Sequence, residues 1–176
     1  MSVRRAWAPV LLVVLVLLSG MLVGSAGESG AAQPRLTVSS IMIPAAAFVP
    51  TRNTFDYQNL GVALSMISGD GYFTFPVSFP AAVVDIRRIT LYAYDNDAGQ
   101  VVSAALYRDY PPGAEVALLG SVSTSGASTA APTVVATTAI SPRRISTAAH
   151  GAYLWVYLSG PAVTLYGVKV AYEIVG

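Results

Sequence analysis

Short runs of β-branched and aromatic residues recur along most of this chain, and Gly, Pro, Asn or Asp residues separate them. Within several runs the apolar residues alternate with a period of two, which suits a half-buried strand and no helix. Phe73, Phe75, Val77 and Phe79 share one face in this way, and no window shows a helical apolar stripe. The strands expected from this pattern are Leu60–Ile67, Tyr72–Phe79, Asp85–Tyr94, Val101–Arg108, Val116–Val122, Thr133–Ile140, Ala152–Leu158 and Val163–Ile174. The sequence therefore predicts an all-β fold, a single jelly-roll-like β-sandwich of about eight antiparallel strands.

The N-terminal segment has the three parts of a secretory signal peptide. Arg4 and Arg5 precede an uncharged run over residues 6–27, and small residues follow around Ala26. We predict a signal peptide over residues 1–26, a flexible lead-in over 27–40 and a β-sandwich domain over 41–176. A retained membrane anchor is the alternative, because about 20 apolar residues span a bilayer. Both interpretations place the domain outside the cytoplasm, secreted or at the cell surface.

Charge and cysteine content exclude several classes of function. Only 11% of the residues are charged, the net charge is +1, and there is no cysteine. Without residues 1–26 the chain keeps eight basic and nine acidic residues, a net charge of about −1. No basic surface for nucleic acid is expected, and disulfides and thiolate chemistry are excluded. A membrane partner is expected only if the leader is retained.

Four segments of the chain resemble a known group of proteins. They are Ile43–Pro50, Phe75–Pro80, Ile89–Asp97 and Leu165–Tyr172. Together they resemble a recurrent group of secreted bacterial β-sandwich proteins with no assigned function. The resemblance implies export and a β-sandwich over roughly residues 41–174, and it carries no catalytic or binding residue to this chain.

The residues that catalysis would need are sparse. His150 is the only histidine, so a histidine-based triad or metal pair would depend on it alone. Most of the nine acidic residues lie at expected turns or strand ends, although a pair that the fold brings together stays open as an alternative. We expect no enzyme, no catalytic residue and no cofactor.

Calcium is the one ion that the sequence suggests. Asp95, Asn96 and Asp97 present alternating oxygen ligands before Gly99, with Asp70 as a distant further ligand. However, Leu106 stands at the position where a twelve-residue calcium loop needs an acid. A hairpin turn explains the same residues without a metal, and we favour the turn.

Aromatic residues form the candidate ligand-binding site. Tyr153, Trp155 and Tyr157 lie on one face of an expected strand whose other face is apolar, and Tyr92 and Tyr94 form a second pair. Because both of its faces are non-polar, the strand of Trp155 is expected to be central or to meet a partner. The rings would then line the core, line a subunit contact or stack against a ligand.

Two functions follow from these features. Residues 116–142 carry no charge, which favours a structural or self-associating extracellular component, and this is our first prediction. The alternative is a small module that binds a carbohydrate or a surface protein through its aromatic face. Leu165-Tyr166-Gly167-Val168 is similar to the closing strand of trimeric jelly rolls of the tumour-necrosis-factor and complement-globular-head type, a resemblance that implies a homotrimer.

Overall fold

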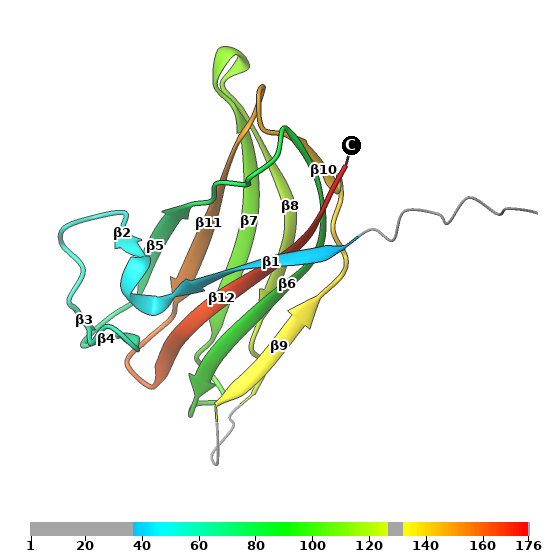
Figure 1. Ribbon diagram of the computed structural model, residues 1–176. Helices are drawn as coiled ribbons and strands as arrows, with labels where there is room; N and C mark the ends of the chain where they lie inside the picture. The colour runs from blue at the N-terminus through cyan, green and yellow to red at the C-terminus, as the bar shows by residue number, and fades with distance from the viewer. Residues whose placement is uncertain (1–36, 127–131, 176) are drawn as a thin grey trace, which may run out of the picture. The chain divides into compact units, whose positions relative to one another are not determined.

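A computed structural model describes residues 37–126 and 132–175 of the chain (Figure 1). The predicted signal peptide 1–26 and most of the lead-in 27–40 lie outside these residues. Within them the chain forms twelve strands and two short 3₁₀ turns. No helical turn in the described ranges has the length and apolar character that a membrane span requires.

The strands form two antiparallel sheets, which confirms the predicted β-sandwich. In the larger sheet the order is β10-β6-β12-β4-β3, and β1 and β9 pair with β12 and β6. Its strands are β1 (Val38–Pro44), β3 (Tyr57–Asn59), β4 (Leu64–Met66), β6 (Val83–Asp95), β9 (Thr133–Thr137), β10 (Arg144–Ser146) and β12 (Val163–Ile174).

The smaller sheet has the order β2-β5-β11-β7-β8, with β11 at its centre. Its strands are β2 (Val49–Pro50), β5 (Gly71–Pro76), β7 (Val102–Tyr110), β8 (Glu115–Ser123) and β11 (Gly151–Leu158). The 3₁₀ turns are η1 (Ala45–Ala47) and η2 (Pro111–Gly113). The strand of Trp155 is therefore central in its sheet, one of the two positions that its two non-polar faces predicted.

Each of the eight predicted strands overlaps an observed one, and the structure adds β1, β2, β3 and β10. β1 begins at Val38, inside the predicted lead-in, and pairs along its whole length with β12. The prediction of eight strands was therefore too low. β2, β3 and β10 are too short to show a periodic pattern, and their neighbours in the sheets define them.

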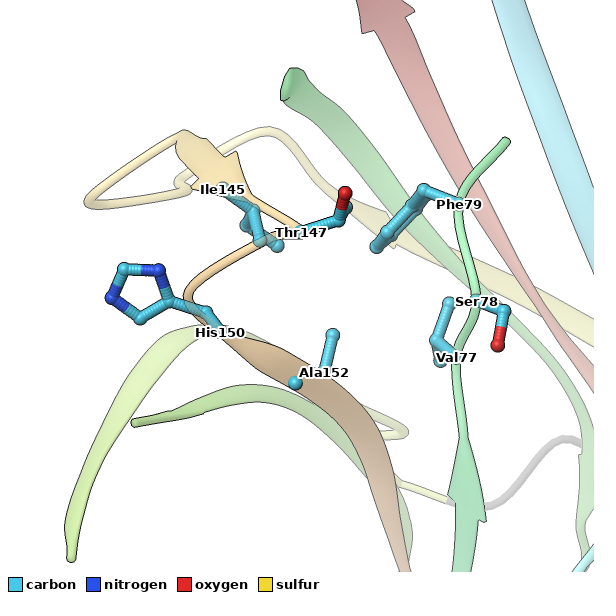
Figure 2. Close-up of a pocket in the computed structure, with 8 residues that line it drawn as sticks. Val77, Ser78, Phe79, Ile145, Thr147, His150 and Ala152 are labelled. Carbon is cyan, nitrogen blue, oxygen red and sulfur yellow. The ribbon is translucent and has the colours of Figure 1, made fainter. Parts of the chain in front are cut away.

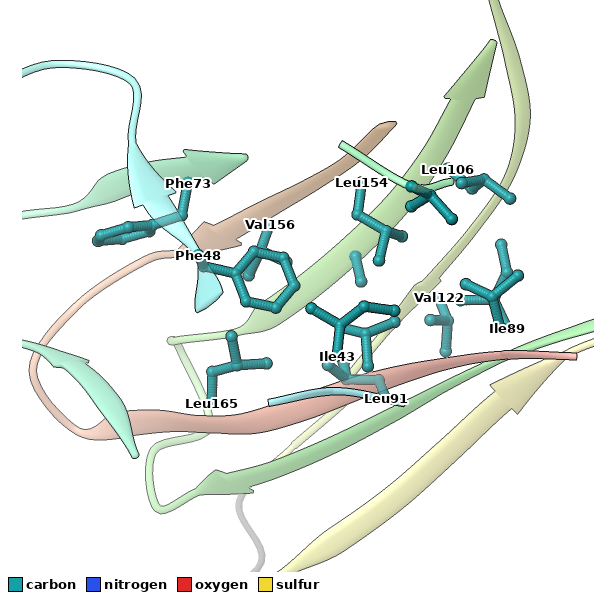
Figure 3. Close-up of a cluster of buried hydrophobic side chains, with 14 of the residues drawn as sticks. Ile43, Phe48, Phe73, Ile89, Leu91, Leu106, Val122, Leu154, Val156 and Leu165 are labelled. Atoms are coloured by element: carbon teal, nitrogen blue, oxygen red, sulfur yellow. The ribbon is translucent and has the colours of Figure 1, made fainter. Parts of the chain in front are cut away.

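The core lies between the two sheets and consists of inward side chains from both (Figure 3). Leu91 and Leu165 of the larger sheet face Leu106 and Leu154 of the smaller one, and all four are fully buried. These residues occupy alternate strand positions, so every second residue is left on an outer face.

The turn at Asp95-Asn96-Asp97 is not a hairpin, which corrects the sequence interpretation. β6 and β7 are consecutive along the chain but belong to different sheets, so this turn crosses the edge of the sandwich. At the crossing Asp95 is fully buried and accepts a hydrogen bond from the Thr124 hydroxyl at the end of β8. Thr124 in turn accepts a hydrogen bond from the Val102 backbone N–H at 3.0 Å. This network ties the two sheets together.

Candidate aromatic binding face

Five aromatic rings gather on the outer face of the smaller sheet. β11 contributes Tyr153, Trp155 and Tyr157, because Ala152, Leu154, Val156 and Leu158 point into the core. The register then brings one ring from each neighbouring strand, with Tyr72 of β5 opposite Tyr157 and Tyr107 of β7 opposite Tyr153. We call these five residues the aromatic face.

Trp155 lies between two stacked tyrosine pairs. The ring centroids of Tyr72 and Tyr157 are 4.7 Å apart, and those of Tyr107 and Tyr153 are 5.3 Å apart. The Trp155 ring meets Tyr72 edge-on at 5.8 Å and Tyr107 at 6.1 Å. Such contacts add about 0.5–1.5 kcal/mol per pair and hold the rings in fixed orientations.

The aromatic face is open to solvent. Trp155 is 38% exposed and Tyr72 is 40% exposed, although both carry large aromatic rings. Beside them the surface is hollowed by about 230 Å³, lined by Tyr72, Tyr107, Trp155 and Tyr157 together with Ser103 and Ala105. Ser103 and Ala105 lie opposite Tyr157 and Trp155 on β7, so small side chains next to large rings create the hollow.

Polar groups lie at the rim of this hollow. The Tyr157 hydroxyl donates a hydrogen bond to Asp70 Oδ2 at 3.2 Å. Partial burial, followed by the contact with Asp70, raises the pKa of the Tyr157 phenol above its usual range. Burial, followed by the nearby Tyr107 and Asp109, also raises the pKa of Tyr153. Both phenols therefore stay neutral at physiological pH. Because the Tyr157 hydroxyl already donates its hydrogen to Asp70, its oxygen offers a ligand an acceptor only.

The structure separates the two aromatic groups that the sequence suggested. Tyr92 and Tyr94 lie half-buried on β6, on the outer side of the larger sheet, and do not join the aromatic face. Tyr72 and Tyr107 belong to the face but were not among the predicted site residues. Their strand positions placed them on an outer surface, but only the register of β5, β11 and β7 shows that they meet.

The residues considered for calcium are engaged by the protein itself. Besides the Thr124 hydroxyl, Asp95 accepts a hydrogen bond from the Asp97 backbone N–H at 3.2 Å. Asp97 accepts one from the Gly99 N–H at 2.6 Å. Asp70 contacts Tyr157 instead of this turn. In residues 37–126 and 132–175 no three His, Asp or Glu side chains form a group that could hold a metal ion.

A second hollow, of about 380 Å³, contains His150 at its margin (Figure 2). Its walls include Val77, Phe79 and Ile145. The imidazole of His150 extends away from Val77 and Phe79. His150 Nδ1 lies 3.2 Å from the Ser146 carbonyl oxygen, and Thr147 donates its hydroxyl hydrogen bond to the Ala81 carbonyl at 2.9 Å. Both side chains therefore contact backbone carbonyl groups near them in the structure.

The fold does bring two carboxylates together. Asp85 of β6 lies opposite Glu173 of β12, and Arg87 contacts both of them. A hydrogen bond from Arg144, helped by the charges of Arg144, Arg87 and Arg143, lowers the pKa of Asp85 despite its partial burial. Asp85 is thus held ionised, which is the opposite of what a general acid requires.

No family model matches the chain, and no curated protein matches it. Solved structures with a similar arrangement of strands include three carbohydrate-binding modules. The C-terminal CBM6 of LamC, a marine laminarinase from Zobellia galactanivorans, is 14% identical, with 75% of this chain and 98% of that chain covered and a TM-score of 0.47. CsCBM6-3 from Clostridium stercorarium, in complex with cellobiose, is 18% identical, with 77% and 91% covered and a TM-score of 0.43.

CBM6cm-2 from Cellvibrio mixtus lichenase 5A, in complex with cellotriose, is 12% identical, with 74% of this chain and 95% of that chain covered and a TM-score of 0.43. At such low identity the likeness concerns the β-sandwich alone. What this chain binds must follow from its own residues.

Proposed function

We propose that this protein is an exported, non-catalytic binding module that holds a neutral saccharide on the aromatic face. The observation that carries the proposal is the Trp155 ring, exposed and fixed between two tyrosine pairs beside a hollow. Large apolar rings on a surface are costly in water unless a ligand or partner covers them.

The chemistry of a sugar fits this surface. The C–H face of a pyranose is apolar and packs flat against an aromatic ring, while its hydroxyls need hydrogen-bond partners at the side. Trp155 and Tyr72 supply the exposed rings, and the Tyr157–Asp70 pair supplies a phenol and a carboxylate at the rim. Because aromatic side chains have few rotatable bonds and these rings contact one another, little ordering is required on binding.

Ligand binding replaces self-association as the favoured function. Self-association would cover the aromatic rings of β11, whereas ligand binding needs them accessible. Within this chain the rings lie on an open outer face. The hollow offers recessed space and hydroxyl groups, which suit a small polar ligand better than a flat contact between copies. The uncharged run over residues 116–142 remains compatible with self-association.

Calorimetric titration of the full chain with cellotriose, xylotriose and laminaritriose tests the proposal. We expect at least one of these neutral probes to bind, and Trp155→Ala to weaken that binding by tenfold or more. That loss corresponds to about 1.4 kcal/mol, which is typical of a central aromatic contact.

Val116→Ala is the matched control. Val116 is an apolar residue of β8 that is 55% exposed and lies outside the hollow. Its substitution should leave the affinity unchanged, and both variants should melt close to the wild type. A folded Trp155→Ala variant with wild-type affinity would show that the sugar binds elsewhere.

A further inference from the structure

The basic residues of the described chain are gathered on the outer side of the larger sheet. Seven basic side chains are described, and five of them lie on or directly before β6, β10 and β12. The five are Arg87, Arg88, Arg143, Arg144 and Lys169. These strands carry only two outward carboxylates, Asp85 and Glu173, so a nearly neutral protein has one locally positive face.

A β-bulge places two consecutive arginines on this face. The register of β6 with β12 shifts between the pairs Arg88–Ala171 and Ile86–Tyr172, which leaves Arg87 without an opposite residue. Ile86 and Ile89 on either side are fully buried. Arg87 and Arg88 therefore both occupy the outer side, whereas a regular strand would have turned one of them inward.

The two arginines border a hollow of about 470 Å³ above β12. Lys169 and Glu173 of β12 line the same hollow, where Arg87 neutralises Glu173. Ser39, Ser40 and Thr138 add hydroxyl groups at its edges. Lys169 and Arg88 lie diagonally across the β12–β6 pair, since Arg88 is opposite Ala171 and Lys169 is opposite Thr90. Diagonal positions are close enough for long side chains to reach one ligand.

Two of these cations are free of carboxylates. Arg87 contacts Glu173 and lies 3.9 Å from Asp85, and Asp85 also binds Arg144 at 2.9 Å. No carboxylate among the described residues comes within ion-pair distance of Arg88 or Lys169. Arg87 Nε is buried and has no acceptor in the described part of the chain, so this guanidinium also keeps an unused donor.

We propose that this hollow binds an oxyanion, either free in solution or as the acid group of a saccharide. Arg88 and Lys169 would supply the charge, and the hydroxyls of Ser39, Ser40 and Thr138 would supply neutral donors. Guanidinium and ammonium groups that converge on one point form charge-assisted hydrogen bonds to carboxylate or sulfate oxygens. The site is separate from the aromatic face, because it lies on the other sheet.

The test is a calorimetric titration of the full chain at low salt with trigalacturonate and, separately, with sodium sulfate. We expect the Arg88→Gln/Lys169→Gln double variant to bind at least about tenfold more weakly than the wild type. Arg52→Gln/Arg108→Gln is the matched control, because it removes two charges away from the hollow and should bind like the wild type.

The two probes separate the sources of the anion. Tighter binding of trigalacturonate than of sulfate identifies a saccharide acid, and equal binding identifies a site for free oxyanions. Trp155→Ala should bind both probes normally, so failure of the aromatic site would not affect this result. Absence of binding by both probes, or equal weakening in both double variants, would overturn the proposal.

Discussion

The two outer faces of the sandwich share the same alternation of inward and outward residues, but their outward side chains differ in chemistry. Along β11, every second residue is a buried aliphatic side chain and the residues between them are Tyr153, Trp155 and Tyr157. Along β12, buried Val168 and Val170 alternate in the same way with outward Lys169 and Ala171. Since the core requires only the inward positions, the outward positions are free to differ. We therefore expect function to depend on these outward residues, aromatic rings on one sheet and cations on the other.

If the two sheets contribute equally to the core, truncating a core leucine of either sheet should destabilise the fold to a similar extent. Leu154 of the smaller sheet and Leu91 of the larger one are both fully buried. Each Leu→Ala variant should lose about 2–5 kcal/mol of unfolding free energy, measured by urea denaturation, because each leaves a cavity. Trp155→Ala, on the outside of the same β11, should lose much less. A loss below about 1 kcal/mol for one leucine only would mean that its sheet is not packed as described.

The second prediction concerns the residue that ties the two sheets together. Asp95 is fully buried and bonded to the Thr124 hydroxyl and the Asp97 N–H. Asp95→Ala should cost about 1–3 kcal/mol in unfolding free energy, because it leaves buried donors without an acceptor. The neighbouring exposed Asn96→Ala provides the control. If the two variants are equally stable in urea, the network does not hold the sheets.

The faces of single strands could be predicted from the sequence, but their assembly could not. A period of two was sufficient to place Tyr153, Trp155 and Tyr157 together, and the two non-polar faces of their strand predicted that it is central or meets a partner. It could not show that Tyr72 and Tyr107 complete the cluster, since that depends on the pairing of strands far apart in the chain. Nor could it distinguish a ligand face from a subunit contact, because the same residue types serve both.

Irregular features were missed for a related reason. In a regular strand, one of Arg87 and Arg88 would point inward and the other outward. The bulge that changes this is visible only in the register of β6 with β12. Asp95 looked like an ordinary turn residue because an edge crossing and a hairpin use the same residue types. The bulge depends on how β6 pairs with β12, and the crossing depends on which sheet β7 joins.

Salt should distinguish the two faces. Binding of a neutral trisaccharide to the aromatic face should change less than about twofold between 0.05 and 0.5 M NaCl, because no net charge is neutralised. Binding of trigalacturonate to the Arg88–Lys169 hollow should weaken severalfold over the same range, since exposed charges are screened. Calorimetric titrations at both salt concentrations measure this. Equal salt sensitivity of both probes would indicate that they share one site.

The smallest expected effect comes from the ion pairs that border the charged face. Arg144 holds the pKa of Asp85 below its usual range, so the folded state favours the ionised carboxylate. A lowered pKa contributes stability above the unfolded value, near pH 4, and that contribution disappears as the pH falls through the folded value. Asp85→Asn should therefore lower the Tm at pH 7, by less than about 4 °C because the Arg144 side chain of the pair is largely exposed.

The difference in Tm between wild type and Asp85→Asn should shrink below about pH 4, which thermal melts followed by circular dichroism would show. Glu115→Gln removes a carboxylate for which no ion pair is described and should show no such trend. A difference that persists at pH 2.5 would mean that ionisation of Asp85 is not its source.

Because Asp85→Asn also removes a negative charge beside Arg87, it should strengthen sulfate binding modestly while leaving the aromatic face unaffected.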